Sequence, residues 1–364
     1  MTLLTIVLFI FILGLLVFVH EMGHFIVAKL SNIKVEEFAF GFPPKIWSKK
    51  KGETVYAINA IPIGGYVKML GESEESQSSK SFSQKKPGTR ATVSVAGVLM
   101  NVVLAWLILT IGFAVGMSPL VSSPDSIPGK KISSSVIVAG TDSGSVASKA
   151  GIQSGDSLIS ASSTGEPEVV FDTANSVTNF TKSHVGKPVS IIYRRDNQEK
   201  STSVILGSDE SAPLGVSIVE NSVVRTPWYW SPVVALREIV RIIGINFVFL
   251  KSFFGQLFSH GQISKEVGGP VAIYIFTGMA AKAGVMVVLQ FVAILSISLA
   301  LINILPFPAL DGGRLLFIAL EKIFRRKIVK ENVENIIHLV GFALILLFAA
   351  IITYKDIINL IIKK

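Results

Sequence analysis

The sequence contains no cysteine and few charged residues. The absence of cysteine excludes disulfide bonds, cysteine-ligated zinc and a cysteine nucleophile. Asp, Glu, Lys and Arg make up 16% of the 364 residues, whereas hydrophobic residues make up 50%, and the mean hydropathy is +0.59. An ordinary soluble protein is less apolar than this. The composition therefore indicates a membrane protein with several spans and a polar insert.

The formal net charge of +9 does not indicate a nucleic-acid-binding protein. Many of the basic residues flank apolar segments, where the excess of Lys and Arg on the cytoplasmic side of membrane proteins accounts for them. We therefore expect the lipid bilayer as a partner and no nucleic acid.

Four apolar segments are long enough to cross ~30 Å of hydrocarbon. They are residues 2–30, 91–117, 283–305 and 336–353. The first is too long for a signal peptide and lacks a basic start, so we expect it to be retained as a membrane span. Basic residues follow the first and third segments and place both of those ends on the cytoplasmic side. Those after the third are Arg314, Lys322, Arg325, Arg326, Lys327 and Lys330.

The first apolar segment contains the motif His20-Glu21-Met22-Gly23-His24. In a helix, His20 and His24 lie one turn apart on the same face, which is the spacing at which two imidazoles bind one Zn²⁺ and Glu21 acts as general base. The alternative is a chance match in which both histidines are satisfied polar residues of a helix bundle. Because ionisable residues within an apolar span are costly, their default interpretation is functional. The motif predicts zinc-dependent hydrolysis within the membrane.

The third apolar segment runs into Asn303–Gly313, which contains two prolines and an aspartate. Prolines end a helix, and irregular backbone at membrane depth must be buried in protein or line a wet cavity. A catalytic zinc takes three protein ligands, so Asp311 is the expected third. Glu36 and Glu37 follow the motif too closely and lie in a predicted strand. As an alternative, Asp311 caps a helix.

Residues 33–70 are expected to form strands and a turn. Lys50–Glu53 has the composition of a turn and Thr54–Ile58 that of a strand, while proline and glycine interrupt Ile61–Val67. Two interpretations stay open: a small cytoplasmic hairpin, or a sheet near the zinc whose free edge pairs with an extended substrate segment. Residues 71–90 are polar and are expected to be a flexible connector.

Two helical segments carry polar residues that need an explanation. Gly97 and Asn101 lie one turn apart in the second apolar segment, and we favour helix packing for both. Residues 228–260 are apolar but interrupted by charges, which predicts an amphipathic helix at the membrane interface.

Residues 118–226 are rich in Ser, Gly and Asp and contain short strand patterns. Within them, Gly144–Ile159 resembles the helix–turn–strand signature of a PDZ domain, and there is room for one such domain. PDZ domains bind peptide ends or strands by edge addition. The alternative is a bulky plug that excludes large substrates without binding them specifically.

Together these motifs resemble the bacterial RseP-like branch of the site-2 protease family, which consists of intramembrane zinc metalloproteases. The resemblance covers nearly the whole chain and includes Gly64–Gly71. It implies that zinc is bound by His20, His24 and Asp311 and that Glu21 is the base. It also implies that substrate is bound by Asn303, Gly64, Gly65 and Tyr66.

The sequence departs from the family pattern at three points. Val98 follows Ala96-Gly97 where members often have proline, and Ser298 stands where some members have a second asparagine. Well-known members have two PDZ domains, whereas this chain has room for one. The third difference concerns access of substrates rather than the chemistry.

The expected fold is a polytopic α-helical membrane protein of four transmembrane helices, with a membrane-associated β region and an inserted extracytoplasmic PDZ domain. The expected parts, in order, are the first span with its zinc motif (1–31), the β region and connector (32–90), the second span (91–117), the PDZ domain (118–226), the interfacial helix and loop (227–282), the third span with Asp311 (283–313), a basic loop or helix (314–335), and the fourth span with the tail (336–364).

The expected activity is that of an endopeptidase which cleaves transmembrane segments of single-pass proteins in the bacterial inner membrane, with its active site near the cytoplasmic face. The resemblance implies anti-sigma factors and remnant signal peptides as substrates of regulated intramembrane proteolysis. Two other classes compete with this expectation. An idle scaffold does not need a base between two metal ligands, and a transporter predicts internal repeats and charges along the spans that the sequence lacks.

Overall fold

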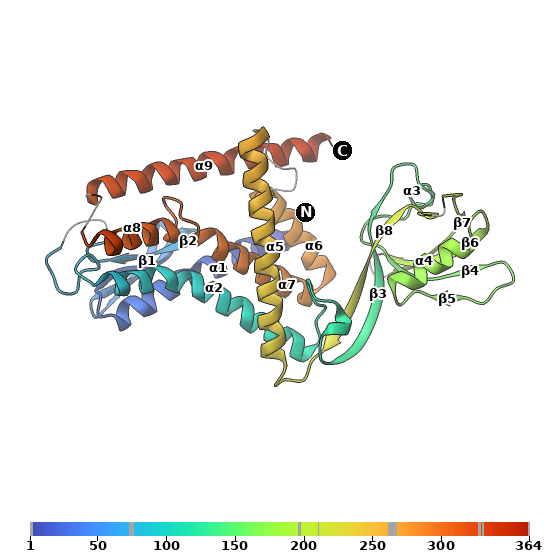
Figure 1. Ribbon diagram of the computed structural model, residues 1–364, viewed down its shortest axis with the longest axis horizontal. Coiled ribbons are helices and arrows are strands. Elements are labelled where there is room, and N and C mark those ends of the chain that lie inside the picture. Colours follow the sequence, from blue (N-terminus) through green and yellow to red (C-terminus); the bar gives the residue numbers. More distant parts are fainter. Residues whose placement is uncertain are drawn as a thin grey trace. The chain divides into compact units, whose positions relative to one another are not determined.

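The computed structural model describes residues 3–72, 76–195, 198–209, 211–260, 268–326, 329 and 331–362. The chain divides into two compact units (Figure 1). The helical unit comprises Met1–Gly112 and Pro232–Lys364, and the inserted unit comprises Phe113–Ser231.

Four helices of the described chain are long and apolar enough to cross a membrane, as the four apolar segments predict. They are α1 (Leu3–Leu30), α2 (Pro87–Val115), α7 (Val285–Asn303) and α9 (Glu331–Ile362). Ile12 and Leu16 of α1 are buried with Val292 of α7, and Leu104 of α2 packs against them. The first three of these helices therefore share one apolar core.

Three further helices complete the helical unit: α5 (Ser231–His260), α6 (Pro270–Ala283) and α8 (Asp311–Phe324). In Figure 1, α5 runs steeply across the direction of α1 and α9, and it matches the amphipathic segment expected there. The sequence analysis placed no separate helix at α6. Gly284, at φ +110°, separates α6 from α7. Asp356 of α9 accepts hydrogen bonds from the N–H groups of Gly269 (2.9 Å) and Ala272 (3.2 Å), which fixes the start of α6.

The expected strands between α1 and α2 form an antiparallel pair, β1 (Val35–Lys51) and β2 (Thr54–Met69). Gly52, at φ +62°, makes the turn between them. The pairing register is irregular, so that Ala39 pairs with both Tyr66 and Ala57. The end of β2 is buried against α1 in a cluster that includes Ala28, Val67, Met69, Phe82 and Val93. This packing sets the sheet beside the first span.

Residues 71–90 were expected to be a flexible connector, and the part that the structure describes is anchored on the helical unit. The Phe82 side chain is 5% exposed, and its N–H donates to the Leu70 carbonyl at 2.7 Å. The Lys34 N–H donates to the Lys80 carbonyl at 3.0 Å. The buried Phe82 ring and these backbone hydrogen bonds together anchor the segment on the core.

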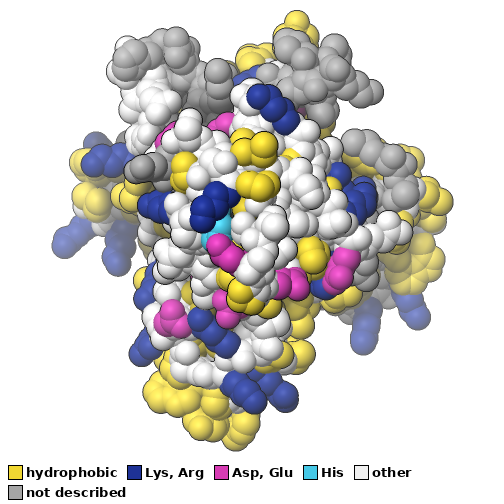
Figure 2. Space-filling view, turned by 90° about the vertical axis from the view of Figure 1, so that its right-hand side faces the viewer, with side chains coloured by type: hydrophobic (Ala, Val, Ile, Leu, Met, Phe, Trp, Pro, Cys, Tyr) yellow, Lys and Arg dark blue, Asp and Glu magenta, His cyan; other side chains and the backbone are white. Residues whose placement is uncertain are grey.

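In its described residues, the inserted unit is a sheet with two α-helices and one short 3₁₀ helix, Pro124–Ser126. Its strands are β3 (Lys130–Thr141), β4 (Ser157–Ser163), β5 (Val169–Val170), β6 (Pro188–Arg195), β7 (Gln198–Ile205) and β8 (Val216–Arg225). Their order is β7-β6-β4-β3-β8, with β5 paired to β4. The helices are α3 (Val146–Lys149) and α4 (Ala174–Ser183). The unit has an apolar core of its own, and the face in Figure 2 carries interspersed basic and acidic side chains.

Candidate metal centre

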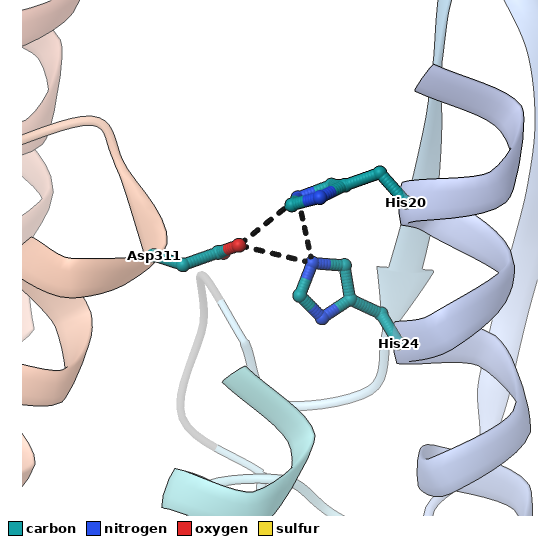
Figure 3. Close-up of side chains that lie close together, drawn as sticks. All are labelled: His20, His24 and Asp311. Atoms are coloured by element: carbon teal, nitrogen blue, oxygen red, sulfur yellow. Dashed lines mark hydrogen bonds and ion pairs between the residues drawn. The ribbon is translucent and has the colours of Figure 1, made fainter. Parts of the chain in front are cut away.

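Three potential ligands converge inside the helical unit. His20 and His24 project from α1, and Asp311 is the first residue of α8 (Figure 3). The two Nε2 atoms lie 3.2 Å apart. Asp311 Oδ2 lies 3.0 Å from His20 Nε2 and 3.3 Å from His24 Nε2. Asp311 is thus brought next to His20 and His24, although about 290 residues separate it from them in the sequence, and the three ligand atoms lie within 4.8 Å of one another.

These three groups fit a catalytic zinc ion. Two imidazole nitrogens and a carboxylate oxygen form a typical ligand set, which leaves the fourth position for water. Ligands at ~2.0–2.1 Å from a tetrahedral zinc lie about 3.3 Å from one another, close to the distances between these atoms. Asp311 Oδ2 is also buried and has no hydrogen-bond partner of suitable geometry among the described residues. A metal ion would satisfy this oxygen.

The Nδ1 atoms of both histidines, which point away from Asp311, face residues of α2. His24 Nδ1 donates to the Val93 carbonyl at 2.8 Å, so its Nε2 carries the lone pair that faces the cluster. His20 Nδ1 lies 3.3 Å from the Asn101 amide nitrogen, and Asn101 Oδ1 is buried without a partner among the described residues. Rotation of the amide by half a turn would let Oδ1 accept a hydrogen bond from His20 Nδ1. Either histidine then presents Nε2 to a metal.

Gly97 and Asn101 lie between α2 and α1, as helix packing predicts, and both also lie against the two histidines. A Cβ atom at Gly97 would lie 2.4 Å from His24 Nε2 and 2.8 Å from His20 Cε1. Asn101 is fully buried behind His20. The sequence signal was their spacing of four residues on one face, but it did not show which helix that face meets.

Asp311 is carried by a tight loop between α7 and α8. A Cβ at Gly312 would lie 2.1 Å from the Leu305 carbonyl oxygen, and a Cβ at Gly313 would lie 2.3 Å from that of Phe307. Only glycine allows this approach of α8 to the loop. Leu310 is the N-cap of α8 and no side chain caps the helix. The alternative role of Asp311 as a helix cap is therefore not favoured.

Most of the other candidate residues surround a cavity of about 350 Å³ next to the three ligands. Glu21, Tyr66 and Asn303 line it together with the ligands themselves. Gly65 lies against Glu21, because a Cβ there would be 3.6 Å from Glu21 Cγ. Gly64 does not line the cavity, and its φ of +103° places it against the Phe42 ring. Glu36 and Glu37 take no part, since they pair with Lys68 and Lys45.

The sequence analysis missed three ionisable residues that line this cavity: Glu72, Arg314 and His338. Arg314, one turn after Asp311 on α8, is hydrogen-bonded to Glu72 at the end of the sheet region. His338 is a polar residue within the apolar fourth segment, which was a usable signal. Arg314 was counted only as part of a basic loop. Its pairing with Glu72 spans 242 residues and leaves no local pattern.

Arg314 and Glu72 form an ion pair beside the cavity. The Asp311 carboxylate lies beside the imidazoles of His20 and His24. Burial lowers the pKa of Arg314, but the charge of Glu72 outweighs it and raises this pKa above its ordinary value. Binding of a metal ion by Asp311 requires the ionised form of its carboxyl group.

The chain is similar in sequence to a known peptidase family and to several zinc metalloproteases. A model of peptidase family M50 matches residues 8–348. Zinc metalloprotease RasP of Geobacillus kaustophilus is 29% identical over 452 residues, which cover 98% of each chain. RasP of Shouchella clausii is 30% identical over 443 residues, 98% of this chain and 99% of the relative. A Clostridium perfringens protein named provisionally as a zinc metalloprotease is 36% identical over 346 residues, 94% of this chain and 95% of the relative.

Proposed function

Because this chain belongs to peptidase family M50, the site-2 protease family of zinc metalloproteases, we propose that it cleaves the transmembrane segments of single-pass membrane proteins. The observation that carries this proposal is the convergence of His20, His24 and Asp311 beside a cavity. Residues of α1, the first apolar helix, form part of the lining of that cavity. The family acts on membrane-protein substrates within the bilayer.

In the proposed mechanism, His20, His24 and Asp311 bind the zinc ion. When bound, zinc acts as a Lewis acid that lowers the pKa of water and polarises the scissile carbonyl. Glu21 lines the same cavity and takes the proton of the attacking water, then returns it to the leaving amine. The Val93 carbonyl and Asn101 keep both imidazoles turned toward the ion.

Asn303, Tyr66 and the backbone of Gly64 and Gly65 are proposed to hold the substrate in extended form. A helix hides its carbonyls in its own hydrogen bonds, so a protease must bind an unwound segment. Residues 65–69 of β2 pair with residues 35–40 of β1. The position of Gly65 beside Glu21 supports the pairing of a substrate strand with this part of the sheet.

The inserted unit is proposed to act as a single extracytoplasmic PDZ domain that restricts access to substrates already trimmed outside. Two features support this role. β8 lies at the end of the strand order, and a groove runs between it and α4. Val177 and Lys182 of α4 and Leu214 and Ile218 near β8 line the groove. An edge strand beside a groove suits the addition of a peptide strand.

The proposed location is the bacterial cytoplasmic membrane, with the active site near the cytoplasmic face. The exposed lysines of β1, which are Lys45, Lys49, Lys50 and Lys51, support this orientation. Lys327 and Lys330 of the second basic segment lie outside the described residues. Anti-sigma factors and remnant signal peptides are the proposed substrates.

The deciding experiment compares the purified chain with its Glu21→Gln variant in detergent, using a tagged single-pass substrate with and without a zinc chelator. Loss of the base is expected to lower the cleavage rate about 10²–10⁴-fold while bound zinc stays near one equivalent. Chelation is expected to abolish cleavage by the unaltered chain. If neither protein cleaves and neither binds zinc, the protease assignment fails and a scaffold is favoured.

A further inference from the structure

The loop that carries Asp311 contains a residue in an unfavourable backbone conformation. Ala309 has φ +74°, in the left-handed region that L-residues with a Cβ seldom adopt. Such a residue persists only where its surroundings impose the conformation. Ala309 lies two residues before Asp311, so its conformation determines where the chain enters α8 and where the carboxylate points.

The fourth apolar helix provides the contacts that impose this conformation. His338 Nδ1 of α9 accepts a hydrogen bond from the Ala309 N–H at 2.8 Å. One turn further along α9, a Cβ at Gly341 would lie 2.5 Å from Pro308 Cβ and 2.7 Å from the Pro308 carbonyl oxygen. The absence of a side chain at Gly341 lets α9 approach the loop, and the imidazole of His338 then reaches the Ala309 backbone.

We propose that His338 is a positioning residue of the metal centre, which holds Ala309 in its left-handed conformation so that the Asp311 carboxylate faces His20 and His24. The proposal rests on the zinc-binding role of Asp311. It assigns His338 no contact with zinc or substrate. The positioning role of His338 depends on one hydrogen-bond acceptor, its Nδ1 atom, and not on the size of the imidazole ring.

The imidazole also makes packing contacts, which a test must separate from the hydrogen bond. Its ring centroid lies 5.8 Å from that of Phe317 on α8, and Nε2 lies 3.9 Å from Glu334 Oε1. Asparagine at position 338 offers a carbonyl oxygen near the place of Nδ1 and removes the ring. Leucine fills space but accepts no hydrogen bond. Glycine at position 309 adopts positive φ without strain, so it makes the hydrogen bond less necessary.

The experiment measures zinc affinity of the full chain in detergent by competition with a chromophoric chelator. The variants are His338→Leu, His338→Asn, Ala309→Gly and the double variant Ala309→Gly/His338→Leu. We expect His338→Leu to weaken zinc binding about 10–100-fold, as loss of a supporting hydrogen bond does at other metal sites. We expect His338→Asn to restore most of the affinity. The double variant is expected to bind zinc more tightly than His338→Leu alone.

Leu339→Ala is the control, because Leu339 neighbours His338 on α9 and its side chain is 67% exposed. It should leave zinc affinity unchanged. The melting temperature of the zinc-free proteins, measured in parallel, reports general damage to the fold. The positioning role is refuted if His338→Leu binds zinc as the unaltered chain does. It is also refuted if affinity is recovered neither by His338→Asn nor by adding Ala309→Gly to His338→Leu. If the unaltered chain binds no zinc, the metal centre itself is refuted.

Discussion

Gly97 determines whether the two histidine rings have room to meet a metal ion. A Cβ at this position of α2 would approach His24 Nε2 to 2.4 Å and His20 Cε1 to 2.8 Å. Asn101, one turn away, lies behind His20. One face of α2 thus provides space for the histidine rings at Gly97 and, one turn later, a hydrogen-bonding side chain at Asn101.

We expect Gly97→Ala to weaken zinc binding by at least about tenfold, because the added methyl group would displace the liganding nitrogen of His24. Competition with a chelator measures the affinity. Gly88→Ala is the matched control on the same helix, since a Cβ at Gly88 meets nothing within 4 Å. Equal zinc affinity in the two variants would contradict this interpretation of the site.

Asn101→Leu tests the support behind His20. The substitution keeps the branched shape of the side chain but removes both polar atoms, so His20 loses the group that fixes its ring. We expect zinc affinity to fall about 10–100-fold, with the zinc-free melting temperature little changed or raised. A variant with normal zinc affinity and a lowered melting temperature would return Asn101 to the role of helix packing.

At the scale of elements, Arg314 and Glu72 connect α8 to the segment that follows β2. Their side chains are 29% and 16% exposed, and the Arg314 guanidinium also lies 5.7 Å from the Phe82 ring centroid. The helix that begins with Asp311 is therefore tied to the sheet that is proposed to hold the substrate.

Breaking this pair is expected to destabilise the chain. We expect Glu72→Gln and Arg314→Met each to lower the free energy of unfolding by about 1–3 kcal/mol, and the double variant to lose less than the sum of the two. Chemical denaturation in detergent measures these changes. Glu53→Gln breaks the exposed pair with Lys80 (2.9 Å) and should have little effect. Strictly additive losses would show that Arg314 and Glu72 do not interact.

At the scale of the whole molecule, the two units have separate apolar cores. The three proposed zinc ligands all belong to the helical unit. A ligand that binds one folded unit stabilises that unit alone, unless unfolding of the two is coupled.

We therefore expect two thermal transitions, of which only one responds to zinc. At free zinc 100-fold above the dissociation constant, the helical unit should gain about 2.7 kcal/mol. Calorimetry with and without chelator tests this, and the Asp311→Asn variant is the control whose transitions should be insensitive to zinc. A single transition that shifts as a whole would show that the units unfold together.

What could be predicted from the sequence follows from the range of each interaction. The spacing of His20 and His24 is local, and the four spans are continuous in sequence, so both were found. Asp311 was identified because the two histidines of the first segment imply a third zinc ligand. Asn101, Glu72 and His338 act through partners that lie 81, 242 and 29 residues away. Their roles depend on which helix faces which, and periodicity does not carry this information.

The cavity beside Glu21 has a consequence for the supply of a reactant. Hydrolysis consumes one water molecule per peptide bond, and water is scarce in hydrocarbon. A volume of about 350 Å³ accommodates roughly ten water molecules at ~30 Å³ each. Polar side chains such as Asn303, Tyr66 and Arg314 line this space. The cavity therefore has the size and the polar lining to hold the water that hydrolysis consumes.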